Sequence, residues 1–372
     1  MPNSLANPVI ADQHDWSPYD GENTTDDKML LPIDMRFNDG HRLSIMVYST
    51  LMLISAIGNL TVLTILIKRR MRGSSRIEIM LTHLAIADLM VTFLMMPLEI
   101  GWAVTVSWKG GDLMCRVMAF FRTFGLYLSS FILVCISIDR YYAVLRPLSL
   151  SENRGKIMVA VAWIFSCACS TPQAIIFHVE NHPNITWYQQ CVTYNFFANE
   201  IHEIYYSVFG MLMMYALPLV VVIFSYSSIY FEIFRRTRIS NTDRFRRSSV
   251  EILSRAKRRT LRMSFTIVLV FVVCWTPFYV MSIWYWVDRE TAIKLDQRIQ
   301  KCLFLFACTN SCMNPIVYGV YNIRKKIDRN NMVKSNYSIR YYSQDYTNSS
   351  LYGQNSKKMI RDRDSSRTIC IR

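Results

Sequence analysis

The sequence contains few charged residues, since Asp, Glu, Lys and Arg make up only 19% of its 372 residues. It also lacks the H-E-x-x-H pattern of zinc proteases and the G-x-S-x-G pattern of serine hydrolases. His202 and Glu203 begin the first pattern, but no second His follows at the required spacing. These absences argue against an enzyme, including one that works inside a membrane.

Long apolar segments make up much of the chain, and hydrophobic residues account for 52% of it. Seven segments are apolar over about 20 residues or more, enough for an α-helix to cross the roughly 30 Å hydrocarbon core of a bilayer. A lipid-facing backbone must satisfy its own hydrogen bonds, so we predict an all-α membrane protein, a seven-transmembrane helix bundle. The predicted spans are residues 44–67, 77–101, 114–144, 156–177, 204–231, 261–287 and 300–321.

No internal repeat relates these seven spans to one another. Transporters usually contain repeated halves with broken helices at matching positions, so a transporter or channel is the less favoured alternative. A receptor that catalyses nothing itself is the class that we favour.

The connections between the spans differ in charge. Basic residues fill the segments after the first span, between the third and fourth, between the fifth and sixth, and after the seventh, whereas acidic residues predominate before the first. Short basic loops mark the cytoplasmic side, so we expect an extracellular N-terminal tail at 1–43, a bundle at 44–321 and a plasma-membrane location. The formal net charge of +15 is then mostly cytoplasmic, and no nucleic-acid partner is needed to explain it.

The first 15 residues contain neither the basic nor the apolar region of a signal peptide, so the first span is expected to act as its own insertion signal. Asn23 and Asn184 begin N-x-S/T glycosylation acceptors in segments predicted to lie outside. The same pattern at Asn336 and Asn348 lies in the predicted cytoplasmic tail and is discounted.

Eight of the ten cysteines lie in predicted spans or in the tail, where they are expected to be small buried apolar side chains. Cys115 opens the third span on the outer side, and Cys191 lies in the outer loop between the fourth and fifth spans. Because the outside of a cell is oxidising, we predict a disulfide between these two. It would tie the outer loop over the mouth of the bundle.

Asp88 lies near the middle of the second span, where an ionisable side chain is costly and suggests a function. It is too deep to reach the membrane surface and must meet polar partners inside the bundle. We favour a polar switch network that could hold an allosteric Na⁺, with no other cofactor expected, over a simple packing role. The candidate partners at similar depth are Asn59, Ser129, Asn310, Ser311 and Asn314.

Helical spacing places two further charges on inward faces. Glu99 follows Asp88 by about three turns, and Arg122 precedes Arg140 by about five full turns. Arg122 is therefore expected near the outer mouth and Arg140 at the inner mouth. Glu99 and Arg122 could form a structural ion pair, or they could be the polar groups of a ligand site.

Aromatic residues gather around Pro277 in the sixth span. They are Trp275, Phe278, Tyr279 and Trp284, and the second span adds Trp102. Such clusters are more often core, but apolar walls beside a few polar groups are also the usual form of a ligand site. Pro277 removes a backbone hydrogen bond and kinks its helix, which allows the inner end of the helix to move.

Asp139 and Arg140 stand side by side at the inner end of the third span. The pair can neutralise itself while the bundle is closed, and movement of the sixth span would release Arg140 into a cytoplasmic cavity. The facing stretch 255–262 is basic and contains no acid. We therefore expect only a weak electrostatic contact between Arg140 and the sixth span. Other contacts are expected to keep the inner face of the bundle closed in the resting state.

Taken in order along the spans, these residues resemble the rhodopsin-like (class A) G-protein-coupled receptors over about residues 44 to 330. The matching motifs are Gly58-Asn59, "LAIADL" around Asp88, Cys115 with Cys191, "DRY" at 139–141, Trp163, Pro218, Tyr226, "CWTP" at 274–277 and "NPIVY" at 314–318. The resemblance implies a heterotrimeric G protein as partner. It also implies a set of switch residues, namely Asp139, Arg140, Tyr141, Tyr226, Pro277, Asn314, Pro315 and Tyr318.

Residues 107–148 look like the third-span region of the gonadotropin-releasing-hormone receptor superfamily, and most like insect adipokinetic hormone receptors. In that superfamily the positions of Glu99, Trp102, Arg122 and Tyr285 meet the peptide hormone, and the rings of Trp275, Phe278 and Tyr279 would add apolar contacts. The resemblance implies a short amidated, pyroglutamyl peptide ligand, signalling through Gq and calcium and often through Gs and cAMP, and mobilisation of energy stores. Receptors for corazonin or the adipokinetic/corazonin-related peptide share this scaffold and remain the alternative.

The sequence after the last span is polar and basic. Residues 322–330 are predicted to form an amphipathic eighth helix on the membrane lipid, and residues 331–372 a disordered cytoplasmic tail. Tail hydroxyls are expected targets of a receptor kinase, whose phosphates would recruit an arrestin. An inert solvated tail is the alternative.

Overall fold

The computed structural model describes residues 35–71, 75–146, 152–182, 185, 187–240, 247–288, 291–292 and 297–321. The chain divides into two units, Met1–Tyr318 and Gly319–Arg372, and only residues 319–321 of the second, which continue the last helix, are described. Several predictions lie outside the described residues. They concern residues 1–34 of the N-terminal tail, the helix at 322–330, the tail at 331–372, Asn23 and Asn184.

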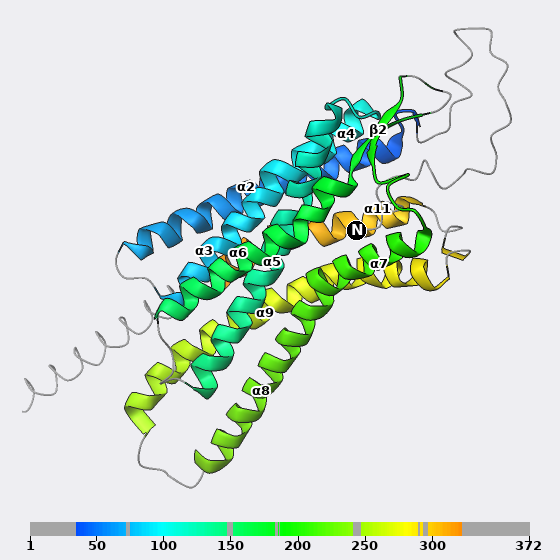
Figure 1. The fold of residues 1–372 in the computed structure, drawn as a ribbon. Helices are drawn as coiled ribbons and strands as arrows, with labels where there is room; N and C mark the ends of the chain where they lie inside the picture. Colours follow the sequence, from blue (N-terminus) through cyan, green and yellow to red (C-terminus); the bar gives the residue numbers. More distant parts are fainter. Residues whose placement is uncertain are drawn as a thin grey trace, which may run out of the picture. The chain divides into compact units, whose positions relative to one another are not determined.

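The described residues form helices and one small hairpin. In chain order the elements are α2 (Asp39–Arg70), α3 (Arg76–Met90), the π-helical turn η4 (Val91–Met95), α4 (Met96–Thr105), α5 (Gly111–Leu145), α6 (Glu152–Ile176), β1 (His178–Asn181), β2 (Gln189–Val192), α7 (Glu200–Met211), the π-helical turn η6 (Leu212–Ala216), α8 (Leu217–Ser240), α9 (Arg247–Val287) and α11 (Gln297–Cys308), followed by helical residues 310–321. In the first unit the helices run side by side, and α5 lies among its neighbours (Figure 1).

Seven helical segments of the described chain are long and apolar enough to cross a membrane, which confirms the predicted bundle. They are Asp39–Arg70, Arg76–Thr105, Gly111–Leu145, Asn153–Ile176, Glu200–Arg235, Arg258–Val287 and Ile299–Tyr321. The third is central, since 78% of its most apolar window is buried in the protein, against 22% for the first. The helix of the first span begins at Asp39 rather than at residue 44, because the Asn38 side chain accepts a hydrogen bond from the backbone N–H of His41 at 3.1 Å.

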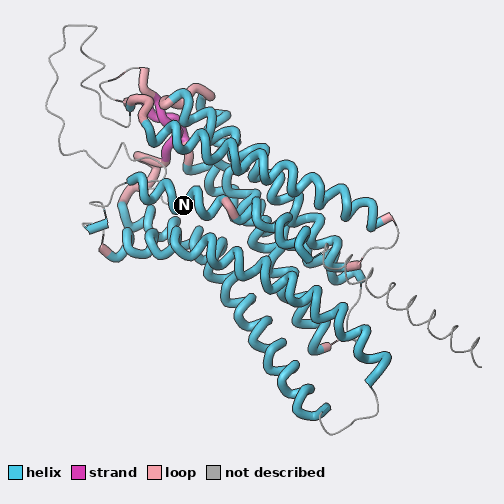
Figure 2. Tube along the Cα trace, turned by 180° about the vertical axis from the view of Figure 1, so that it is seen from behind, coloured by secondary structure: helices cyan, strands magenta, loops and turns pink. Residues whose placement is uncertain are grey.

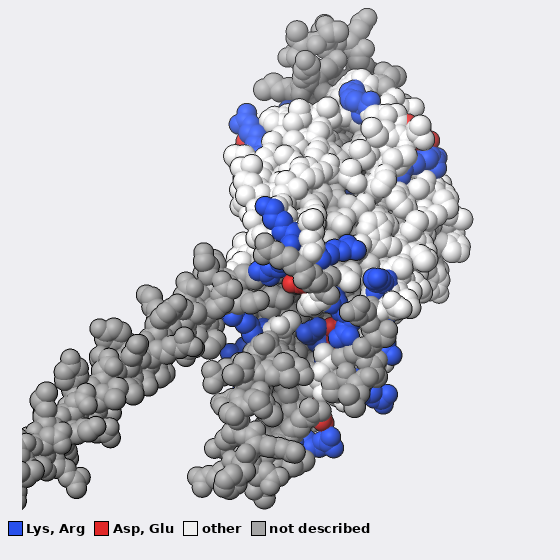
Figure 3. Space-filling model, turned by 90° about the vertical axis from the view of Figure 1, so that its left-hand side faces the viewer, with Lys and Arg blue, Asp and Glu red and all other residues white. Residues whose placement is uncertain are grey.

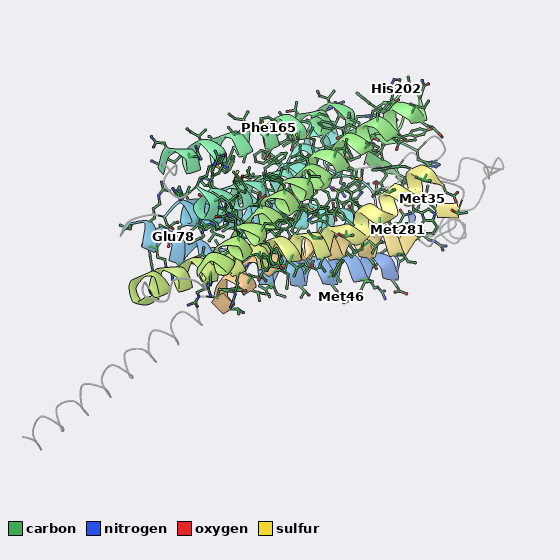
Figure 4. The ribbon with its side chains drawn as sticks, turned by 90° about the horizontal axis from the view of Figure 1, so that it is seen from below. Met35, Met46, Glu78, Phe165, His202 and Met281 are labelled. Atoms are coloured by element: carbon green, nitrogen blue, oxygen red, sulfur yellow. A yellow bond between two sulfur atoms is a disulfide. The ribbon has the colours of Figure 1, made fainter. Side chains whose placement is uncertain are left out.

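The outward faces of the helices are apolar. Met46 on α2 and Phe165 on α6 lie on opposite sides of the bundle, and they are 60% and 55% exposed (Figure 4). Much of the face drawn in Figure 3 is uncharged, and most of its charged side chains are Lys and Arg. Exposed apolar side chains on backbones that bond internally are what a lipid-facing surface requires.

Three prolines shape the spans that surround the candidate site. Pro97 and Pro218 each follow a π-helical turn, Val91–Met95 and Leu212–Ala216. A proline lacks an N–H and its ring crowds the preceding turn, and a local π-helical turn relieves both problems. Pro277 stays inside the continuous helix α9, where Thr276 Oγ1 donates to the Val272 carbonyl at 2.6 Å.

The antiparallel hairpin β1–β2 covers one end of α5. Val179 pairs with Cys191, and Cys191 forms the predicted disulfide with Cys115 of α5, which is thereby confirmed. Figure 2 shows both strands at one end of the helices. We call this the hairpin end, and the end of α5 that carries Arg140 the Arg140 end. Exposed His202 lies at the hairpin end and Glu78 at the Arg140 end (Figure 4).

The prediction that the other cysteines are buried is wrong at two positions. Cys167 and Cys302 are exposed, whereas the described cysteines 135, 169, 274, 308 and 312 are buried. A small apolar side chain loses little by facing lipid, because lipid tails are as apolar as a protein core. Span membership therefore does not decide whether a cysteine is inside the protein.

Candidate ligand and coupling sites

An ion pair joins α4 and α5 near the hairpin end. Arg122 Nε lies 2.8 Å from Glu99 Oε1, and the two side chains are 11% and 14% exposed. The predicted pair is confirmed. The Arg122 guanidinium also lies over the ring of Phe304 on α11, 5.7 Å from its centroid, which is cation–π range. One cation thus links two spans and an aromatic ring from a third.

The aromatic cluster of α9 continues from that ring. Phe304 lies 5.6 Å from Phe278 between ring centroids, and Phe278 contacts both Tyr279 and Trp275 at 5.2 and 6.1 Å. Tyr215 of η6 stacks on Tyr279 at 4.8 Å. Trp275, Phe278 and Tyr279 are buried and form a packed wall that runs from Arg122 to the fifth span, whereas Trp284, the fourth predicted member on α9, is 39% exposed and lies outside it.

A small cavity of about 10 Å³ lies among α5, α7 and α9, with room for about one water molecule. Its lining includes Thr123 and Tyr127 of α5, Ser207 of α7, and Phe278, Tyr279 and Trp286 of α9. The Ser207 hydroxyl and the Trp286 indole N–H are buried and have no hydrogen-bond partner among the described residues. Two buried donors without an acceptor can each donate a hydrogen bond to a carbonyl oxygen of a ligand.

Trp102 lies against the hairpin rather than in this cavity. Its indole N–H donates to Gln190 Oε1 at 2.7 Å, and Gln190 Nε2 donates to the Val106 carbonyl at 2.7 Å. Its ring meets Trp108 edge to face at 5.4 Å. Gln190 was not predicted from the sequence as a partner of Trp102, although it directly precedes Cys191 of the predicted disulfide. Ligand contact at Trp102 and at the partly exposed Tyr285 stays a prediction.

Asp88 is fully buried and has the polar partners that its depth requires. Asn314 Nδ2 donates to Asp88 Oδ2 at 2.8 Å, and the Ser129 hydroxyl donates to Asp88 Oδ1 at 3.3 Å. Both predicted contacts are confirmed. Asn310, another of the predicted partners, is buried, and its Oδ1 has no hydrogen-bond partner among the described residues; the same holds for Asn314 Oδ1.

Oxygen atoms are the ligands that small hard cations prefer. This region contains the Asp88 carboxylate, the Ser129 hydroxyl that donates to it, and two buried amide oxygens, of Asn310 and Asn314, without a hydrogen-bond partner among the described residues. The carboxylate supplies the single negative charge that would balance Na⁺.

Asn59 binds elsewhere than the sequence suggested. Its Nδ2 donates to the Ser311 carbonyl at 3.0 Å instead of to Asp88. Ser311 precedes Pro315 by four residues, and Pro315 has no N–H to donate to that carbonyl. A Cβ on Gly58 would lie 2.8 Å from Pro315 Cγ, so only glycine allows this approach. Asn59 therefore supplies the hydrogen bond that Pro315 cannot donate to the Ser311 carbonyl, and Gly58 leaves room for the proline ring.

At the Arg140 end, Asp139 is 3% exposed and contacts two arginines. Arg140 Nη2 donates to Oδ2, and Arg76 Nε, from the first residue of α3, donates to Oδ1 at 3.0 Å. The predicted Asp139–Arg140 pair is confirmed, but Arg76 was missed. A positively charged side chain in the first turn of a helix interacts unfavourably with the helix dipole. The position of Arg76 was therefore a signal in the sequence that an acidic partner lies nearby.

Three further predicted switch residues lie at this end. Tyr318 accepts a hydrogen bond from Arg69 Nη1 at 3.0 Å, the ring of Tyr226 packs on Phe265 at 5.4 Å, and the ring of Tyr141 lies 5.9 Å from that of Phe224. The contacts tie the seventh span to the first, the fifth to the sixth and the third to the fifth. Their part in switching stays a prediction.

The sequence also matches known proteins. The family profile described as "7 transmembrane receptor (rhodopsin family)" matches residues 58–318. This chain belongs to the rhodopsin family of seven-transmembrane receptors. The family consists of receptors, so the prediction that the chain is not an enzyme is confirmed.

Three curated relatives of this rhodopsin-family receptor are named for gonadotropin-releasing hormone. The gonadotropin-releasing hormone II receptor of Clarias gariepinus is 34% identical over 292 residues, which cover 77% of each chain. The gonadotropin-releasing hormone receptor of Homo sapiens is 34% identical over 265 residues, 69% of this chain and 80% of the relative. That of Mus musculus is 34% identical over 266 residues with the same coverage. The predicted relation to the gonadotropin-releasing-hormone receptors is confirmed.

Proposed function

We propose that this receptor binds a short amidated peptide hormone of the adipokinetic hormone type at its hairpin end and activates a heterotrimeric G protein at its Arg140 end. The observation that carries the proposal is the position of Arg122, which pairs with Glu99 and covers Phe304, the first ring of the aromatic wall. Curated relatives named for a peptide hormone support the same ligand class.

The ligand chemistry follows from the groups near the cavity. A peptide blocked at both ends carries no terminal charge, so it offers carbonyl and amide groups together with aromatic rings. Carbonyl oxygens can accept from Arg122 and from the idle donors of Ser207 and Trp286, while amide hydrogens can donate to Glu99. The rings can pack on Phe278 and its neighbours.

Binding would shift the receptor toward its coupling conformation. A ligand changes a conformational equilibrium only by its different affinity for the two states, and the mobile part here is α9. A ligand group that displaces Tyr279 or Trp275 acts next to Pro277, where α9 can bend. Movement of the inner half of α9 would open the surface around Arg140. We propose coupling through Gq and calcium, with Gs and cAMP as a second route, to mobilise energy stores.

We also propose that Asp88, Ser129, Asn310 and Asn314 hold an allosteric Na⁺ in the resting state. Removing Na⁺ from the buffer, with K⁺ in its place, should raise agonist affinity several-fold in the wild-type receptor. The Asp88→Asn variant should show no such dependence, because the balancing charge is gone. Equal affinities in both salts for the wild type would refute the site.

The proposal places the receptor in the plasma membrane with its N-terminus outside. Basic segments next to the Arg140 end and the disulfide at the hairpin end support that orientation. A receptor kinase and an arrestin are the further partners that we propose for the basic tail.

The test measures calcium and cAMP in cells that express the receptor at their surface. The cells receive synthetic adipokinetic, corazonin, adipokinetic/corazonin-related and gonadotropin-releasing peptides in turn. We expect a response to adipokinetic peptide at the lowest concentration. A lower threshold for corazonin or for the adipokinetic/corazonin-related peptide would move the assignment to that alternative. No response to any of them would refute an adipokinetic-type ligand and leave the receptor family unchanged.

A further inference from the structure

Asp139 is shared between two cations, and only one of them belongs to its own helix. Arg140 contacts one carboxylate oxygen, and Arg76 of α3 contacts the other at 3.0 Å. Asp139 is 3% exposed, while the Arg76 and Arg140 side chains are 21% and 13% exposed. A carboxylate that is almost inaccessible to solvent therefore binds two guanidinium groups, whose positive charges repel each other.

Arg76 is held in this position by its surroundings. A Cβ built on Gly155 of α6 would lie 3.4 Å from Cβ and Cγ of Arg76, so α6 packs along the stem of that side chain. Ser75 precedes Arg76 and caps α3 together with Glu78, which fixes where the helix begins. Packing against α6 and the capped start of α3 together hold the Arg76 side chain beside Asp139.

The sixth span offers Arg140 no competing acid. Between residues 252 and 287 the sequence contains no Asp and no Glu. Among the described residues, the ion pairs at this point join Asp139 to Arg140 and to Arg76.

We propose that Arg76 is a positioning residue that favours release of Arg140, on the basis of the coupling function proposed above. When Arg140 leaves, Asp139 keeps Arg76 as its partner and remains neutralised. Without Arg76, release would leave a buried carboxylate unpaired, which is costly, and the closed pair would no longer be weakened by a second cation. Both effects make the receptor harder to activate when Arg76 is absent.

The experiment measures nucleotide exchange on a purified G protein by the full-length receptor in lipid nanodiscs, with and without peptide. Arg76→Gln should lower peptide-independent exchange about fivefold and shift the peptide response to higher concentration. Arg76→Lys, which keeps the charge, should stay within about twofold of wild type. Lys68→Gln, a loss of an exposed cation at the same end, is the matched control and should change little. Equal or higher exchange by Arg76→Gln would overturn the proposal.

A second arm separates this role from direct contact with the G protein. In an Asp139→Asn background, Arg76→Gln should have no further effect, because Arg76 acts through the carboxylate. An equal loss in both backgrounds would instead assign Arg76 to the G-protein surface and refute the positioning role. Should Arg76→Gln fail to reach the membrane, Arg76→Met keeps the stem without the charge and faces the same criteria. Peptide-independent exchange is read without any hormone, so a wrong ligand assignment would not affect this test.

Discussion

The two ends of α5 carry the same kind of pair in different arrangements. Arg122 pairs with Glu99 of another span and with one aromatic ring. Arg140 pairs with its own neighbour Asp139, and Arg76 adds a second cation to that carboxylate. A pair between two spans changes directly when those two spans separate, whereas the pair within one helix breaks only when movement of another span allows Arg140 to leave Asp139. In our proposal the hairpin-end pair therefore senses the ligand, and Arg76 couples the Arg140-end pair to a second span.

The largest effect that we expect on peptide affinity comes from breaking the hairpin-end pair. Glu99→Gln leaves Arg122 buried without its countercharge, and Arg122→Gln does the same to Glu99. Each variant should lower peptide affinity about 30-fold or more, which corresponds to ~2 kcal/mol. Competition binding with a labelled peptide on surface-expressed receptor measures the change.

The exposed pair Arg116–Asp112 supplies the matched control on the same helix. Its side chains are 38% and 52% exposed, and exposed ion pairs contribute little. Arg116→Gln should change peptide affinity less than about threefold. A loss as large as that of Arg122→Gln would mean that charge near the hairpin, rather than the buried pair, sets affinity.

A second prediction concerns the disulfide that fixes the hairpin beside Trp102. Cys115→Ser with Cys191→Ser should lower the free energy of unfolding by ~2–4 kcal/mol. Thermal denaturation of the purified receptor measures it, with Cys302→Ser, at an exposed free cysteine, as the control. Unchanged stability in the double variant would show that the hairpin is held by Gln190 and its neighbours alone.

A third prediction tests the close packing of Gly58 against Pro315. Gly58→Ala would place a methyl group 2.8 Å from the proline ring, and overpacking of this kind costs ~1–3 kcal/mol. At Gly101 on α4 nothing lies within 4 Å of a built Cβ, so Gly101→Ala should be neutral or slightly stabilising. Thermal stability measured in the same lipid should separate the two. Equal behaviour would mean that the first and seventh spans are not in close contact.

The sequence predicted the bundle because length and apolarity alone determine a membrane span. Helical period also brought Glu99 to Arg122, since both charges must avoid lipid. It could not assign Asn59 correctly, because depth does not reveal that Pro315 frees a carbonyl for it. Nor could it find Phe304, whose role depends on which helix lies beside α5. Contacts between residues of different spans can be identified only when the packing of the helices is known.

The central claim is that the hairpin end binds and the Arg140 end couples. It is tested most directly by Arg140→Ala, with peptide binding and G-protein nucleotide exchange measured on the same nanodisc preparation. The account predicts that peptide still binds, within about tenfold of wild type, while peptide-stimulated exchange is lost. Stimulated exchange at the wild-type level in Arg140→Ala would contradict it.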